Sequence, residues 1–104
     1  MSSLTGFQKK HLRGLAHSLQ PVVRIGRGGL SDGVLAELDE ALESHELIKI
    51  KLGADRDERR RISEEIGAGL DAALVGAIGR VAILFRPARD PEKRRIKVPR
   101  PRSS

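Results

Sequence analysis

The sequence predicts an α/β fold: a two-layer sandwich in which helices pack on a mixed four-stranded sheet, with the element order α-β-α-β-α-β-β. Three segments carry apolar residues at helical spacing, four shorter segments have the apolar pattern of strands, and glycine, proline or capping residues separate them. A chain of 104 residues is large enough for one such domain. Because two successive β-α-β connections should both be right-handed, we expect the second and third helices on one face of the sheet. The other face should then be at least partly open.

The first helix is predicted from Thr5 to about His17. Its start has the form of a capping box, with Gln8 three residues after Thr5, and apolar residues follow at helical spacing. Pro21 interrupts this pattern, and residues 22–25 form a short apolar run that predicts a strand.

Ser31 is expected to cap a second helix that ends near His45. Residues 47–52 then alternate in the manner of a strand. The alternation separates Lys49 and Lys51 from the isoleucines between them, so we expect both lysines on the open face of the sheet.

Asp55 is expected to cap a third helix that ends near Leu70. Two apolar strands follow, over residues 74–78 and 81–86. The dipeptide Gly79-Arg80 between them is typical of a tight hairpin.

The net charge of +6 belongs to the end of the chain. Bases and acids balance through Phe85, whereas the residues from Arg86 onward include eight bases, two acids and four of the five prolines. A segment of this composition does not bury enough apolar surface to fold alone. We therefore predict a folded domain over residues 1–88 and a basic, disordered tail over residues 89–104.

The absence of cysteine excludes disulfides, thiolate metal sites and thiol catalysis. No apolar run approaches the roughly 20 residues that a membrane span needs. The N-terminal residues lack the charged and apolar regions of a signal peptide. We expect a cytoplasmic protein without membrane contact, and a monomer.

The loop formed by Gly26, Arg27, Gly28 and Gly29 is the leading candidate for a binding site. Glycines let the backbone approach a phosphate closely, and the helix that follows offers unpaired N–H groups and the positive end of its dipole. Arg27 can add a charge-assisted hydrogen bond. The G-x-x-G pattern is the one with which KH modules clamp a nucleic-acid backbone, although a plain glycine-rich turn has the same pattern.

Two nucleotide-binding motifs are not matched. A Walker loop requires a Gly-Lys pair, which the sequence lacks, and the dinucleotide fingerprint would need a third glycine where Ser31 stands. We therefore expect no nucleotide cofactor, and the loop remains a candidate for RNA.

Basic residues near the loop support this interpretation, because no acid precedes Asp32. The cations expected to flank the RNA-binding loop are Arg24, Lys9, Lys10, Arg13, Lys49, Lys51, Arg80 and Arg86. The run Arg59-Arg60-Arg61 is interpreted as a solvated helix face. Phe7 and Phe85 are the only aromatic residues, too few for a platform on which bases stack. Recognition should then rest on phosphates and backbone shape, and should depend steeply on salt.

The three histidines do not form a recognisable catalytic or metal site. They are His11, His17 and His45. His45 stands beside Glu46, which could imitate an acid–base pair, but no serine, lysine or carboxylate completes a triad. Scattered histidines without cysteine also make a poor metal site. We expect no enzyme activity and no metal; a small enzyme using His45 and Glu46 is the alternative of that class.

Three segments resemble the signature of a known family, the CRM domain (chloroplast RNA splicing and ribosome maturation). They are LAHSLQPVVRIGRGGL at residues 15–30, HELIKIK at residues 45–51 and IGRVAILFRP at residues 78–87, in the family's order. The resemblance covers about residues 4–88. The family loop usually reads Gly-Lys-Asn-Gly, so Gly28 lacks the amide side chain, and Phe85 stands where tyrosine is common.

The resemblance implies a fold similar to the C-terminal domain of bacterial translation initiation factor three, with RNA binding centred on the G-x-x-G loop. Free-standing bacterial members associate with precursors of the large ribosomal subunit. This implies a ribosome assembly factor that binds 23S rRNA in the 50S precursor, with ribosomal proteins as further candidate partners. The alternative is a protein-interaction module that docks a ribosomal protein or an assembly GTPase through its acidic second helix.

Overall fold

The computed structural model describes residues 4–26, 29–53 and 55–100. Its elements are α1 (Gly6–Ala16), β1 (Pro21–Ile25), α2 (Asp32–His45), β2 (Leu47–Leu52), α3 (Arg56–Leu70), β3 (Ala73–Ile78), β4 (Val81–Phe85) and one turn of 3-10 helix (Pro91–Lys93). Every predicted helix and strand is present in the predicted order. The strand limits differ from the prediction by one residue at β1, β3 and β4.

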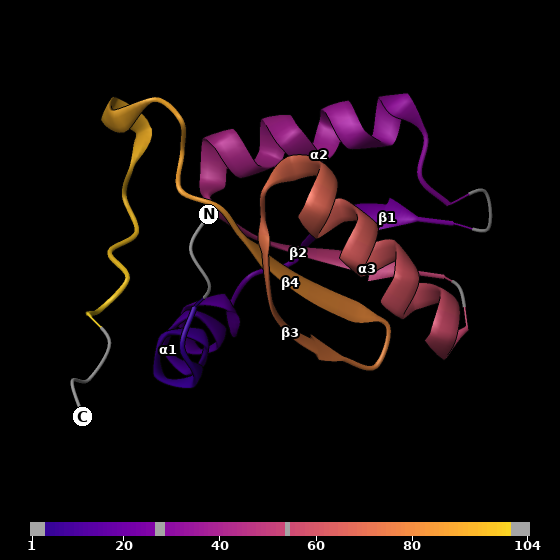
Figure 1. The fold of residues 1–104 in the computed structure, drawn as a ribbon, viewed down its shortest axis with the longest axis horizontal. Helices are drawn as coiled ribbons and strands as arrows, with labels where there is room; N and C mark the ends of the chain where they lie inside the picture. The colour runs from indigo at the N-terminus through magenta and orange to yellow at the C-terminus, as the bar shows by residue number, and fades with distance from the viewer. Residues whose placement is uncertain (1–3, 27–28, 54, 101–104) are drawn as a thin grey trace.

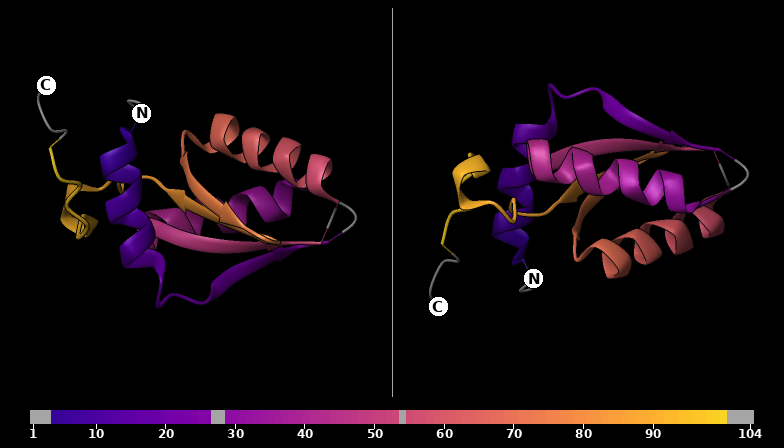
Figure 2. Two further views of the ribbon diagram at one scale, coloured as in Figure 1. Left: turned by 90° about the horizontal axis from the view of Figure 1, so that it is seen from below. Right: turned by 90° about the horizontal axis from the view of Figure 1, so that it is seen from above.

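The four strands form one mixed sheet in the order β1-β2-β4-β3. β1 and β2 are parallel, and β4 is antiparallel to both of its neighbours. α2 and α3 lie together on one face of this sheet (Figures 1 and 2). This arrangement confirms the predicted two-layer α/β fold and follows from two β-α-β connections of the same hand.

The main core fills the space between the sheet and these two helices. α2 contributes Leu38 and Leu42, and α3 contributes Ile62 and Ile66, each pair at helical spacing. The strand residues in the same cluster are Val23, Ile25, Ile48, Ile50, Leu52, Ala82 and Leu84. Burying each large aliphatic side chain contributes roughly 1.5–3 kcal/mol, so this cluster stabilises the sandwich.

α1 packs on the opposite face of the sheet, at the end where β2 begins and β4 ends. Leu12 of this helix is buried with Leu47 and Phe85. Further along the same face, Arg24 and Ile78 remain exposed. The face that the sequence predicted to be partly open is therefore covered at one end by α1.

The helices begin at the side chains predicted to cap them. Thr5 Oγ1 accepts a hydrogen bond from the N–H of Gln8 (3.1 Å), and Gln8 Oε1 accepts one from the N–H of Thr5 (2.9 Å), which completes the capping box. Ser31 and Asp55 accept bonds from the N–H groups three residues after them. Each side chain satisfies a backbone donor that the first helical turn leaves unpaired.

The segment after β4 packs against the domain, although its composition predicted a disordered tail from residue 89. We call residues 88–98 the C-terminal strap. Ile96 and Val98 of the strap pack against the cluster under α1. Gln8 Nε2 also donates a hydrogen bond to the carbonyl of Pro99 (2.9 Å). Residues 101–104 lie outside the described part of the chain.

The strap is anchored by the carboxylate of Glu46, at the start of β2. Glu46 is 1% exposed and accepts hydrogen bonds from the N–H groups of Ala88 (2.8 Å), Arg95 (2.7 Å) and Ile96 (3.0 Å). Burial opposes ionisation of this carboxyl, but the three backbone donors outweigh it and lower the pKa of Glu46. Composition alone does not reveal such an anchor, because it depends on one acid 42 to 50 residues away along the chain.

Candidate nucleic-acid interface

The glycine loop begins where β1 ends. The N–H of Gly29 donates to the carbonyl of Gly26 (3.0 Å), which closes a four-residue turn. Gly29 has a φ of 68°, a conformation that side chains disfavour, and a Cβ there would meet nothing within 4 Å. The loop therefore uses glycine at position 29 for its backbone conformation and leaves open space around it. Arg27 and Gly28 lie outside the described residues.

The connection from β2 to α3 lies against the start of this loop. The N–H of Gly53 donates to the carbonyl of Ile25 (2.9 Å), and a Cβ at Gly53 would lie 3.5 Å from that oxygen. The carbonyl of Arg80, in the β3–β4 turn, accepts from the N–H of Leu52 (2.7 Å). Three chain connections thus meet at one end of the sheet, which we call the loop end.

Arg24, Lys51 and Arg80 are the predicted cations that the fold brings to the loop end. Arg24 is paired with Lys51 across the parallel strands, and Lys51 is paired with Val81. Neighbouring like charges across a sheet destabilise it. An anion bound beside them would relieve this repulsion, so the arrangement suits a phosphate group.

The other predicted cations lie elsewhere. Lys9, Lys10 and Arg13 belong to α1, which packs at the far end of the sheet (Figure 1). Arg13 Nη1 donates to the carbonyl of Val75 (3.2 Å). Lys49 Nζ donates to carbonyl oxygens of residues 17 and 19 (3.4 and 3.1 Å). These bonds attach α1 and the turn after it to the sheet, a structural role that the sequence did not indicate.

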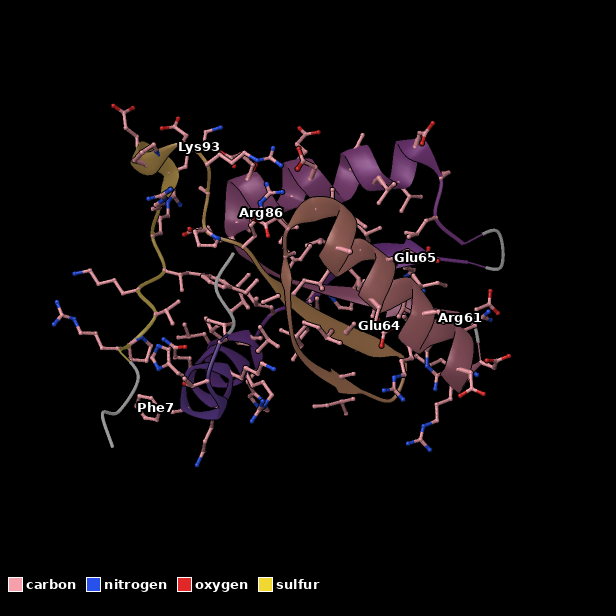
Figure 3. The ribbon with its side chains drawn as sticks, in the orientation of Figure 1. Phe7, Arg61, Glu64, Glu65, Arg86 and Lys93 are labelled. Carbon is pink, nitrogen blue, oxygen red and sulfur yellow. The ribbon has the colours of Figure 1, made fainter. Side chains whose placement is uncertain are left out.

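Arg86 does not belong to an exposed basic surface. It is 3% exposed, and its Nη1 lies 2.6 Å from Asp39 Oδ1 of α2 (Figure 3). It also donates to the carbonyl of Leu70 (3.2 Å). The hydrogen bond from Arg86 lowers the pKa of Asp39. The prediction that Arg86 flanks the RNA site is therefore corrected: this guanidinium ties β4 to α2 and α3.

Two acids of α2 are also engaged inside the domain. Besides Asp39, the carboxylate of Glu43 accepts hydrogen bonds from the N–H groups of Asp90 (3.0 Å) and Arg89 (2.7 Å), which lower the pKa of Glu43. These contacts hold the start of the strap against α2. These acids of α2 thus bind groups within the domain. This weakens the alternative in which the helix docks a basic protein.

The proposed acid–base pair of His45 and Glu46 does not match the geometry. Glu46 is turned toward the strap, where three backbone N–H groups bond it, whereas His45 is exposed. Among the described residues, no three His, Asp or Glu side chains gather in a way that could hold a metal ion. No helix in the described ranges is long and apolar enough to cross a membrane.

The sequence matches the CRS1/YhbY (CRM) domain over residues 4–86. An RNA-binding protein of Haemophilus influenzae is 46% identical over 101 residues, covering 96% of this chain and 99% of the relative. A probable RNA-binding protein of Pseudomonas aeruginosa is 45% identical over 92 residues, with 88% of each chain covered. The solution structure of a hypothetical protein from Staphylococcus aureus superposes with a TM-score of 0.77 at 30% identity, covering 91% of this chain and all of that one.

Proposed function

The chain belongs to the CRM domain family, and on that premise we propose that it is a non-catalytic RNA-binding protein whose contact with RNA is centred on the loop end. The observation that carries this proposal is the closed turn from Gly26 to Gly29 beside Arg24, Lys51 and Arg80. Glycines allow the backbone to approach phosphate oxygens, and the three cations neutralise the charge of the RNA strand.

The expected mode of recognition is a grip on the backbone. Phe85 is 1% exposed and so is withheld from bases, while Phe7 is on α1, away from the loop. Neither phenylalanine is therefore placed to stack on an RNA base beside the loop. Phosphate contacts respond strongly to counterions, so affinity should fall steeply as salt is raised.

We further infer that the RNA is 23S rRNA in precursors of the large ribosomal subunit, that the protein acts there as an assembly factor, and that it does so in the cytoplasm. Family membership supports this finer assignment. Crosslinking in cells, followed by sequencing of the attached RNA, tests it. Enrichment of precursor large-subunit rRNA is the expected result, and crosslinks spread over messenger RNA would overturn the assignment.

The loop itself is tested by Gly29→Asp, with Gly29→Asn as the matched control. Asp and Asn have nearly the same shape and both tolerate a positive φ better than most residues, so the two variants should fold alike. Only Asp places a negative charge where phosphate is expected. Gly29→Asp should bind a large-subunit rRNA fragment at least about tenfold more weakly than Gly29→Asn, equivalent to about 1.4 kcal/mol. Equal affinities in a filter-binding assay would remove the loop from the interface.

A further inference from the structure

A second basic feature lies between the N-terminal half of α3 and the β3–β4 turn. It is a hollow of about 630 Å³, within the size range of small-ligand pockets. Its apolar lining includes the partly exposed Leu74 and Val81, together with Leu52 and Ala82, which are buried. Its basic lining consists of Arg56, Arg59 and Arg60 from α3, together with Arg80 from the turn. We call it the arginine groove.

The arginines converge because of helical geometry. Arg59 and Arg60 follow Arg56 by three and four residues, so the three side chains leave one face of α3. Asp57 is the acid among the lining residues, which leaves a formal excess of three positive charges. Arg60 also meets Glu64 at 3.4 Å, but both side chains are more than half exposed, and such pairs contribute little. The groove therefore keeps a positive potential.

The arginine groove opens at the loop end of the sheet. Leu52 of its lining is bonded through its N–H to the carbonyl of Arg80, and Gly53, the next residue, is bonded to Ile25. Figure 3 shows nitrogen-tipped side chains gathered where α3 begins, close to the β3–β4 turn. A strand held at the glycine loop would therefore pass close to the groove. Arg80 belongs to both regions.

We propose that the arginine groove is a second RNA contact, which takes an unpaired nucleotide of the strand whose backbone the glycine loop holds. The phosphate lies against the guanidinium groups, which bind phosphate oxygens through paired N–H donors. The base lies over the apolar lining and beside an arginine plane, on which bases stack. This inference rests on the proposed function and adds the kind of RNA: one with an unpaired nucleotide next to the backbone that the loop holds.

The test compares Arg60→Gln with Arg61→Gln. Both remove one positive charge from neighbouring positions of α3, but Arg61 does not line the groove. The probes are an RNA hairpin with a single-stranded extension and the same hairpin without it. We expect Arg60→Gln to bind the extended RNA about fivefold to tenfold more weakly, with a salt slope smaller by about one. Arg61→Gln should stay within about twofold of the wild type, because it leaves the groove intact.

Both variants should bind the hairpin without an extension like the wild type. If Arg60→Gln and Arg61→Gln weaken binding of the extended RNA equally, the contribution is diffuse charge and the groove is overturned. Gly29→Asp separates this outcome from failure of the proposed function, because it should weaken binding of both RNAs. A wild-type protein that binds neither RNA would overturn both proposals.

Methyl NMR distinguishes contact with the apolar lining of the groove from electrostatic attraction alone. The extended RNA should shift the methyl signals of Leu74 and Val81, two partly exposed residues of the apolar lining, and Arg60→Gln should reduce that shift. A glutamate-rich peptide serves as the competing ligand. If the peptide shifts these signals and the extended RNA does not, the groove is a protein-binding site and the RNA proposal is wrong.

Discussion

Replacing Glu46 with glutamine is expected to destabilise the domain, because this carboxylate fastens the C-terminal strap. One carboxylate oxygen accepts from Arg95 and Ile96, and the other accepts from Ala88. Glutamine keeps an acceptor for the first pair but points an NH₂ group at the N–H of Ala88. Ala88 is fully buried, so its donor would have no water to bond while the strap stays in place.

The size of the effect follows from these contacts. A buried donor left without an acceptor costs about 1–3 kcal/mol, and two charge-assisted bonds would become neutral ones. We expect the free energy of unfolding to fall by about 2–4 kcal/mol. Glu46 also holds a φ of 64°, where side chains are disfavoured. Glu46→Gly would relieve that strain yet lose the anchor, so it too should be less stable than the wild type.

Urea unfolding of Glu46→Gln, with Glu40→Gln as control, measures this effect. Glu40 is exposed on α2, the helix that ends just before Glu46, and its replacement should change stability by less than about 0.5 kcal/mol. Amide exchange should also become faster at Ala88, Arg95 and Ile96. If Glu46→Gln matches Glu40→Gln and these amides exchange as in the wild type, the anchor contributes nothing and the reasoning is refuted.

The same carboxylate gives stability a pH dependence with a defined sign. The pKa of Glu46 is lowered in the folded state, because three N–H donors stabilise its ionised form despite burial. Its contribution is therefore complete above the unfolded-state pKa, about 4.3, and is lost as the pH falls through the lower folded-state pKa. The stability difference between wild type and Glu46→Gln should shrink over that acidic range. A difference that is constant from neutral to acidic pH would contradict ionisation as the cause.

Three further predictions concern separate parts of the domain. Arg86→Leu should lower the free energy of unfolding by about 2–4 kcal/mol in urea, because Asp39 keeps only the exposed Arg89 as an ion partner among the described residues and the carbonyl of Leu70 loses its donor; an unchanged midpoint would argue against the Arg86–Asp39 ion pair. Gly69→Ala should raise stability by about 0.5–1 kcal/mol in thermal unfolding, because α3 gains helix propensity and a Cβ there meets nothing within 4 Å. Lys51→Gln should reduce the salt slope of RNA binding by about one, whereas Lys10→Gln should not alter it for a short RNA; equal slopes would contradict the assignment to the loop end.

The parts of the fold that the sequence predicted are those that local chemistry determines. Thr5, Ser31 and Asp55 cap helices because an oxygen three residues before a backbone N–H is enough to satisfy it. The alternation over residues 47–52 likewise separates two faces of a strand, whatever lies beyond it. The arrangement of these helices and strands in space then followed, since few topologies accommodate this order of elements.

The features that escaped prediction depend on distant partners. A run of charges and prolines gave no sign that Glu46 would hold residues 88–98, because the anchor is on another element. Arg86 looked like any other base at the end of a strand, and only its approach to Asp39 shows that it is withheld from solvent. The helical spacing of Arg59 and Arg60 from Arg56 was visible in the sequence. The sequence did not show that the β3–β4 turn lies beside these arginines and completes the groove.

The loop end of the sheet is proposed to bind RNA, whereas the end under α1 and the strap stabilises the domain. Because the two ends are far apart, changes in binding and changes in stability can be measured separately. β1 spans five residues, so the ends lie roughly 15 Å apart at about 3.3 Å per residue. This exceeds the screening length of about 8 Å at physiological salt, so cations on α1 and the strap act only weakly on a phosphate at Gly29. A short RNA should therefore respond to Arg24 and Lys51 but not to Lys10, while a longer one that reaches α1 responds to all three. Loosening the strap by Glu46→Gln should, for the same reason, leave the affinity of the folded protein for a short RNA unchanged.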